Sequence, residues 1–213
     1  MTDKWYKPLR CILVGFLLLY SGVGPTPAVT VDEHRDIARL AELMQWKAGT
    51  VVADIGAGSG QYSFLAAGIV GPAGRVYATE IDQQKLKKLR EELTKRRLDI
   101  VIVVESAADD TKLPSNCCDA IFLRRVYHHL TDPHDFDKNV LRSLKNRGEL
   151  AIIDFPPDPN FASVEGVPKN RTGHGIAEDV AIEELTSAGF HLEKRIDNWS
   201  NHDYCIIFSK IDR

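Results

Sequence analysis

The chain has 213 residues, which predicts one domain with a short additional segment. It carries 27 lysines and arginines against 30 aspartates and glutamates, and the formal net charge of −3 argues against a protein that holds nucleic acid by neutralising phosphates alone. Hydrophobic residues make up 44% of the chain and charged residues 27%. This ordinary globular composition excludes a disordered tail, a collagen, a disulfide-stapled miniprotein and a multi-span membrane protein.

Residues 1–28 differ in character from the rest of the chain. Basic residues precede an uncharged apolar run at 11–20, which gives way to small residues and prolines. This order is typical of a secretory signal, and the same run, extended over residues 11–23, would also associate with a membrane as an anchor. We therefore predict a signal peptide or N-terminal membrane anchor at 1–28, with a buried helix or strand as the plain alternative, and a separate domain at 29–213. The protein is expected to be exported or membrane-anchored.

Helices and strands alternate along the body of the chain. Thr30 and Glu33 form the capping-box pattern that starts a helix, and Asp82 is expected to cap a helix that carries Leu86, Leu89 and Leu93 on one face. The helix that follows the capping box is predicted at residues 32–45, and further helices are predicted at 61–70, 134–144 and 178–188. Short apolar runs predict strands at residues 50–55, 75–80, 100–104, 119–123, 148–155, 191–197 and 204–211.

Apolar strands that alternate with helices predict an α/β fold, a doubly wound and mostly parallel seven-stranded sheet covered on both faces. A short polar link joins the last two strands, which predicts an antiparallel C-terminal hairpin at one edge. The long irregular segment 156–175 leaves the carboxyl end of a strand. Sheets of this class bind ligands at that edge, and loops of this length are usually functional.

A glycine-rich loop, Asp54-Ile-Gly56-Ala-Gly58-Ser-Gly60, lies between a predicted strand and a predicted helix. Glycine lets the backbone turn tightly and approach a ligand closely, and the helix start offers unpaired N–H groups. Glu80 ends the next strand, where a carboxylate can accept hydrogen bonds from the two hydroxyls of a ribose. Together these features predict a nucleotide-like ligand, and a plain strand–turn–helix with a solvated Glu80 is the alternative.

Two kinds of ligand share this geometry. A dinucleotide site prefers the spacing G-x-G-x-x-G, with pyrophosphate on the helix start. Here the third glycine arrives one residue early, and Gln61 stands at the dinucleotide position. The carboxylate of Asp54 would repel pyrophosphate but could hold an ammonium group. A ligand with a ribose and an α-amino acid but no phosphate therefore fits better.

These motifs resemble those of class I S-adenosylmethionine-dependent methyltransferases. The resemblance spans about residues 32–211 and is closest to small bacterial-type, single-domain members with a Tyr-His-His after the fourth strand. The matching segments are residues 51–60, 76–82, 113–123, 127–129 and 144–150. The resemblance implies a Rossmann-like methyltransferase fold, S-adenosyl-L-methionine as cofactor, and methyl transfer. The acidic charge balance, and a sequence in which no appended nucleic-acid or protein-recognition domain is visible, lead us to expect a small-molecule acceptor and no nucleic-acid partner.

The resemblance also implies roles for matching residues. Glu80 would bind the ribose hydroxyls, and Ile81 would pack on the adenine. Arg124 would lie near the methionine carboxylate or the acceptor. The adenine edge would lie at Ala107 and Ala108. The methionine part of the cofactor would lie against the loop residues Asp54, Gly56, Ala57, Gly58 and Gly60.

Two positions depart from the family pattern. Ala107 replaces a common acidic residue, so Asp109 or a backbone group would have to recognise the adenine amine. Asn146 and Arg147 replace a Pro-Gly pair before the fifth strand, which should alter only a turn.

Methyl transfer mainly requires that the two reactants are aligned and water is excluded. A base is needed only if the acceptor loses its proton during attack, and His128 and His129 are the candidates because imidazole titrates near neutral pH. Tyr127 would position the acceptor, and His174 would close over the site from the long loop. Packing, or a hydrogen bond at a helix start, is the structural alternative for each of these residues.

The four cysteines of the chain do not form a recognisable metal-binding or redox motif. No C-x-x-C pair is present, and no metal site is predicted. The adjacent Cys117 and Cys118 allow thiol-dependent arsenic methylation, which no wider cysteine set supports.

A nicotinamide-dependent oxidoreductase on a similar fold and a catalytically inactive cofactor-binding protein are the two competing functions. An active methyltransferase would have to face the cytoplasm, because exported compartments are not expected to hold the methyl donor.

Overall fold

The computed structural model describes residues 30–211. The signal peptide or anchor predicted at 1–28, and the membrane association predicted for residues 11–23, lie outside the described residues. Within residues 30–211, no helix is both long and apolar enough to cross a membrane.

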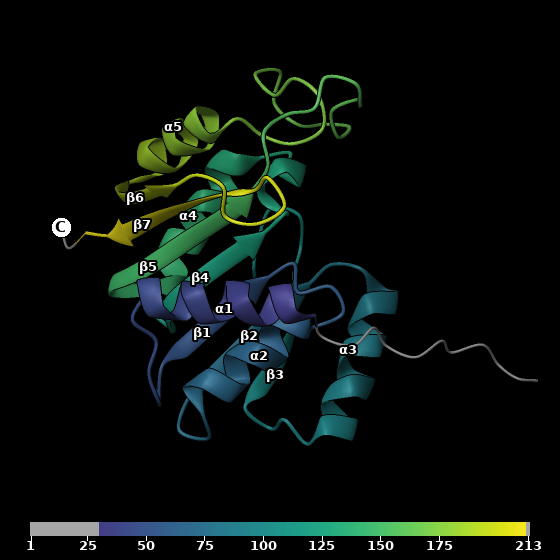
Figure 1. Cartoon of the computed structure of the whole chain (residues 1–213), viewed down its shortest axis with the longest axis vertical. Coiled ribbons are helices and arrows are strands. Elements are labelled where there is room, and N and C mark those ends of the chain that lie inside the picture. Colours follow the sequence, from purple (N-terminus) through teal and green to yellow (C-terminus); the bar gives the residue numbers. More distant parts are fainter. Residues whose placement is uncertain (1–29, 212–213) are drawn as a thin grey trace, which may run out of the picture.

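The described strands form one seven-stranded sheet with the order β3-β2-β1-β4-β5-β7-β6 (Figure 1). Strands β1 to β5 pair in parallel, and β7 pairs antiparallel with both β5 and β6. The predicted fold class and the antiparallel hairpin are confirmed, with one addition: the second strand of the hairpin inserts between β5 and the first. The strands are β1 (Val51–Ile55), β2 (Arg75–Glu80), β3 (Val101–Glu105), β4 (Cys118–Arg124), β5 (Leu144–Asp154), β6 (Phe190–Ile196) and β7 (Tyr204–Lys210).

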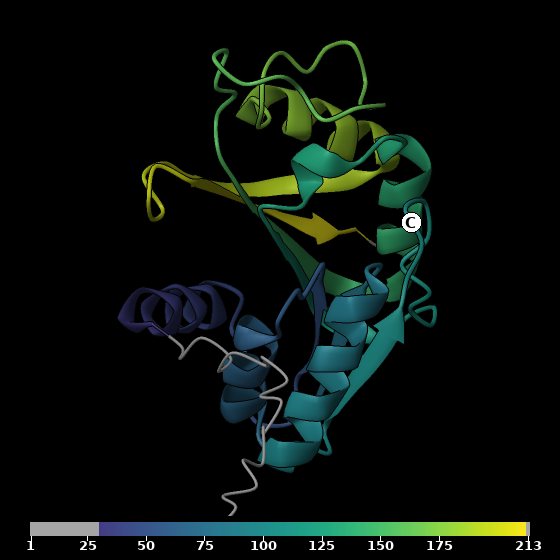
Figure 2. The same ribbon diagram turned by 90° about the vertical axis from the view of Figure 1, so that its right-hand side faces the viewer.

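Helices cover both faces of this sheet (Figure 2). Ile37 of α1 and Phe64 of α2 belong to a buried cluster on one face, and Val140 of α4 and Leu185 of α5 belong to a second cluster on the other. The helices are α1 (Val31–Leu43), α2 (Gln61–Val70), α3 (Gln83–Arg96), α4 (Pro133–Ser143) and α5 (Glu178–Ala188), and a 3-10 turn, η1 (Tyr127–His129), follows β4.

The predicted helix starts are confirmed by their hydrogen bonds. The backbone N–H of Glu33 donates to Oγ1 of Thr30 at 3.2 Å, and the backbone N–H of Thr30 donates to Oε2 of Glu33 at 2.7 Å. Oδ1 of Asp82 accepts from the N–H groups of Gln84 and Lys85. These side chains satisfy donors that a helix start leaves unpaired.

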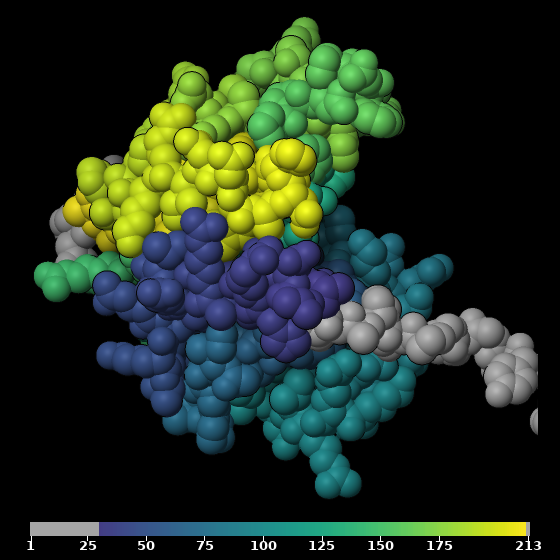
Figure 3. All heavy atoms as spheres, viewed as in Figure 1, coloured from purple at the N-terminus to yellow at the C-terminus, as the bar shows by residue number. Residues whose placement is uncertain are grey.

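The turn between β6 and β7 packs on α1, as the adjoining yellow and purple surfaces in Figure 3 show. Oγ of Ser200 donates to Oδ2 of Asp36 at 2.7 Å, and the guanidinium of Arg39 lies 4.4 Å from the centre of the Trp199 ring. These contacts hold the C-terminal hairpin against the N-terminal end of the described chain.

Candidate functional site

A cavity of about 720 Å³ opens at the carboxyl ends of the parallel strands, the ligand-binding edge of doubly wound sheets. Its volume is in the range of small-molecule sites. The walls come from the ends of β1, β2 and β4, the loops after β3 and β5, the start of α3, η1 and α4. Of the predicted site residues, those that line the cavity are Gly56, Glu80, Ile81, Ala107, Ala108, Arg124 and His129.

The other predicted residues lie outside the lining. Asp109, the substitute predicted for adenine recognition, lines a separate shallow pocket beside Asp110 and Arg142. The backbone next to Ala107 and Ala108 is therefore left to meet an adenine edge. The predicted residues that do not line the cavity are Asp54, Ala57, Gly58, Gly60, Tyr127 and His128.

Glu80 links the glycine loop to the start of α3. Its Oε2 accepts a hydrogen bond from the N–H of Gly58 at 2.9 Å, and its Oε1 accepts from the N–H groups of Ile81 at 2.8 Å and Asp82 at 3.0 Å. A carboxylate offers about four acceptor positions. These three bonds therefore leave room for a hydroxyl donor from the cavity, as a ribose would supply.

Two further cavity residues have features that suit a bound cofactor. Ile81 lines the cavity with 59% of its surface exposed, which suits a flat apolar ring. Nε of Arg124 is buried without a hydrogen-bond partner among the described residues, although buried polar atoms are nearly always paired. A guanidinium with a spare donor suits a carboxylate. The cavity therefore fits a ligand with a ribose, an aromatic base and an amino-acid end.

Asp54 lies beneath the glycine loop rather than in the cavity wall. Its side chain is buried, and its Oδ2 accepts a hydrogen bond from the hydroxyl of Ser63 at 2.6 Å. Burial raises the pKa of Asp54 from 3.8 to about 7, and the bond from Ser63 opposes the rise. In this structure Asp54 therefore joins β1 to α2, and the methionine contact implied by the resemblance stays a prediction.

The raised pKa of Asp54 predicts a pH dependence of stability. Between about pH 4 and pH 7 the folded chain holds a proton on Asp54 that the unfolded chain has lost, so the free energy of unfolding should fall as the pH rises through this window. The expected loss is at most about 4 kcal/mol. Denaturant unfolding of the wild type and an Asp54→Asn variant at pH 5 and pH 8 measures this loss. Because asparagine does not titrate, the free energy of unfolding of the variant should rise relative to that of the wild type at the higher pH. An equal difference at both pH values would contradict the prediction.

The three side chains of the Tyr-His-His segment differ in their burial and in their access to the cavity. Tyr127 is buried, and its hydroxyl donates to Oδ2 of Asp137 on α4 at 2.7 Å, so the predicted role in positioning an acceptor does not fit this structure. His128 is also buried. Only His129 lines the cavity, and burial together with the nearby His128 lowers the pKa of its imidazole. Of the two predicted bases, His129 is therefore the one that can meet an acceptor.

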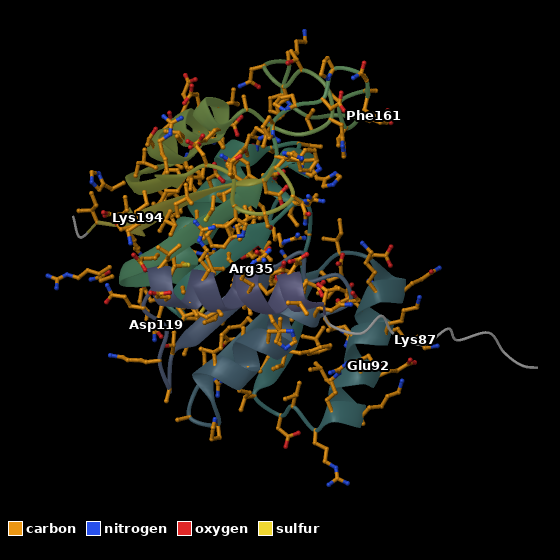
Figure 4. All side chains as sticks on the ribbon, in the orientation of Figure 1. Arg35, Lys87, Glu92, Asp119, Phe161 and Lys194 are labelled. Atoms are coloured by element: carbon orange, nitrogen blue, oxygen red, sulfur yellow. The ribbon has the colours of Figure 1, made fainter. Side chains whose placement is uncertain are left out.

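Several cavity residues were not predicted. Arg125 follows β4 and pairs with the buried Asp203 through three hydrogen bonds of 2.8 to 3.1 Å, which fixes the β6–β7 turn to the rim. Phe136 and Val164 add apolar surface, and Val164 belongs to the long loop that also exposes Phe161 (Figure 4). The position of Arg125 after a parallel strand could have identified it, whereas no sequence signal marks the other two.

The adjacent cysteines lie away from the cavity. Cys118 begins β4, and the cavity lies at the opposite end of that strand, beyond Arg124. Thiol chemistry at Cys117 and Cys118 is therefore separated from the cofactor cavity by the length of the strand.

Comparisons with known proteins agree with this geometry. A methyltransferase-domain family matches residues 53–152. The chain is 31% identical over 133 residues to the ubiquinone/menaquinone biosynthesis C-methyltransferase UbiE of Pseudomonas fluorescens, which covers 60% of this chain and 50% of that protein. It is 29% identical over 113 residues to the demethylmenaquinone methyltransferase of Listeria monocytogenes, with coverages of 53% and 48%. The chain thus matches about half the length of these curated relatives.

A solved structure extends the likeness over most of the chain. The S-adenosylmethionine-dependent methyltransferase from Aquifex aeolicus superposes with a TM-score of 0.71 at 25% identity, covering 83% of this chain and 90% of that one. S-adenosylmethionine is accordingly the cofactor that this family assigns to the cavity. Fold, motifs and relatives agree in that each resembles the class I S-adenosylmethionine-dependent methyltransferases.

Proposed function

We propose that the protein transfers a methyl group from S-adenosylmethionine to a small, largely apolar acceptor. The observation that carries the proposal is the hydrogen bond of 2.9 Å between the Glu80 carboxylate and the N–H of Gly58. In a dinucleotide site the backbone at the second glycine of the loop approaches the pyrophosphate. Here the N–H of Gly58, the second glycine, is already bonded to the carboxylate of Glu80. The loop therefore favours a phosphate-free nucleoside over a nicotinamide dinucleotide.

The cavity supplies alignment rather than acid catalysis. The bound cofactor would supply an activated methyl group on a sulfonium, whose thioether leaving group needs no proton. Glu80, Ile81 and Arg124 would hold its ribose, base and carboxylate. Binding in this crevice would place the acceptor beside the methyl group and exclude water from it.

The acceptor side of the cavity supports an apolar substrate. Val126, Leu130, Phe136 and Val164 line it, and His129 is the titratable imidazole among the lining residues. The relatives from Pseudomonas fluorescens and Listeria monocytogenes are named for quinone biosynthesis and demethylmenaquinone. A hydroxylated ring of quinone type would match this combination of apolar wall and imidazole.

Two measurements test the proposal in sequence. Calorimetric titration with S-adenosylhomocysteine should give binding heat, and titration with NAD should give none. Incubation with methyl-labelled S-adenosylmethionine and a bacterial extract should then move the label into the organic phase.

Each other result overturns a specific part of the proposal. Binding of NAD but not of S-adenosylhomocysteine would indicate an oxidoreductase. Binding of S-adenosylhomocysteine without transfer of label would indicate a cofactor-binding protein. Label found only in the aqueous phase would exclude an apolar acceptor.

A further inference from the structure

Three histidines converge at the rim of the cavity. His128 and His129 belong to η1, and His174 comes from the long loop between β5 and α5. One ring nitrogen of each lies within 4.8 Å of the others. The ring centre of His128 lies 4.0 Å from that of His129 and 4.9 Å from that of His174. The fold therefore gathers three imidazoles from two segments that are distant in the sequence.

His128 is oriented by a buried carboxylate. Oδ1 of Asp154 is 2.8 Å from Nδ1 of His128, and Asp154 also accepts from the backbone N–H groups of His128 and Phe155. Because a carboxylate only accepts, Nδ1 carries the proton and Nε2 is left for another partner. A carboxylate behind an imidazole is the usual support of a metal-binding histidine.

The free nitrogen of His128 is unsatisfied. The residue is 3% exposed, and its Nε2 is buried with no hydrogen-bond partner among residues 30–211. A buried polar atom without a partner is rare and calls for a ligand. This observation is independent of the clustering of the three rings.

The loop that carries His174 is anchored to the turn that carries the other two. The buried guanidinium of Arg171 donates to the carbonyl oxygens of Tyr127 and Leu130 at 3.0 Å each, and to Glu184 at 2.7 Å. Next to His174, a Cβ on Gly175 would lie 2.8 Å from the carbonyl oxygens of Phe155 and Pro156. This close approach seats the loop on the end of β5, so the position of His174 is built by the fold.

We propose that His128, His129 and His174 bind one divalent transition-metal ion of the zinc type. Three imidazoles suit such ions, and three protein ligands leave a fourth position open. His129 lines the cavity, so the open position would face the acceptor side. Tetrahedral zinc requires nitrogen atoms about 3.3 Å apart, which rotation of the partly exposed His129 and His174 would provide. The proposal concerns ion binding and does not depend on methyl transfer.

Titration of the tag-free, chelator-treated full chain with Co²⁺ tests the site, because cobalt bound by three imidazoles gives visible absorption bands. One equivalent should saturate these bands, and Zn²⁺ should displace the cobalt. His174→Ala and Asp154→Asn should each weaken Co²⁺ binding by at least about tenfold, the first by loss of a ligand and the second by loss of its support. Circular dichroism establishes whether each variant is folded. If one of the two variants does not fold, His129→Asn is tested in its place.

A second group offers a matched control. Asp132, His134 and Asp135 also lie within metal-binding distance of one another, but all three are exposed. His134→Ala should leave Co²⁺ binding unchanged. The proposal is overturned if Co²⁺ produces no bands with the wild type, if folded His174→Ala or His129→Asn binds as tightly as the wild type, or if His134→Ala abolishes binding.

Discussion

Replacement of Glu80 by alanine is expected to weaken the binding of S-adenosylhomocysteine by at least about tenfold. The substitution removes the acceptor proposed for the ribose hydroxyls. It also frees the N–H groups of Gly58, Ile81 and Asp82, which Glu80 now holds in place. Isothermal titration of the two proteins with the same ligand measures the loss.

Glu105→Ala is the matched control for this experiment. Glu105 on β3 lies opposite Glu80 on β2 in the strand register, and its side chain is exposed and outside the cavity lining. Its loss should leave affinity within about twofold of the wild type. Unchanged affinity in a folded Glu80→Ala protein, or an equal loss in both variants, would reject Glu80 as the ribose-binding residue.

The second large effect concerns Gly60, which precedes α2 with a φ of 88°. An added Cβ would collide with Cδ1 of Leu89 and lie 2.7 Å from Cζ of Phe64, and both of these side chains are buried in the core. Gly60→Ala is therefore expected to lower the free energy of unfolding by about 2–5 kcal/mol, from overpacking and from the left-handed backbone together. Denaturant unfolding at a fixed pH gives this value.

Gly58→Ala separates these two causes. Gly58 also has a positive φ, of 57°, but a Cβ there would meet nothing within 4 Å. The expected loss is about 1 kcal/mol, the cost of the backbone conformation alone. If the two variants were equally unstable, the collision with Leu89 and Phe64 would not be the reason for glycine at position 60.

Local signals predicted the element boundaries best where a side chain or a glycine ends a helix. The helix at Glu178–Ala188 was predicted to the residue, because Gly189 follows it with a φ of 109°. The start of β5 was predicted four residues late. Lys145, Asn146 and Arg147 look like a turn, but Leu144 is buried opposite Cys118, and Nζ of Lys145 pairs with Asp119 at 2.9 Å. Tertiary contacts therefore extend the strand through polar residues.

The site residues that lie at the carboxyl ends of parallel strands could be predicted from the sequence. Gly56, Glu80 and Arg124 come directly from parallel strands, and the topology brings them to one edge. The directions of Tyr127 and His128 were not predictable, because each depends on a partner elsewhere in the chain, Asp137 for the first and Asp154 for the second. A short 3-10 turn has no periodicity from which the sequence could assign an inward face.

The insertion of β7 between β5 and β6 has a consequence for biosynthesis. All residues that line the cavity precede β6, whereas β5 and β6 can enter one sheet only after the strand that separates them has been translated. A polypeptide emerging from the ribosome thus exposes the edge of β5 until Tyr204–Lys210 arrives, and unpaired edges favour aggregation. A premature stop codon shortly before Tyr204 would leave the cofactor-binding half encoded in full and yet yield a product prone to misassembly.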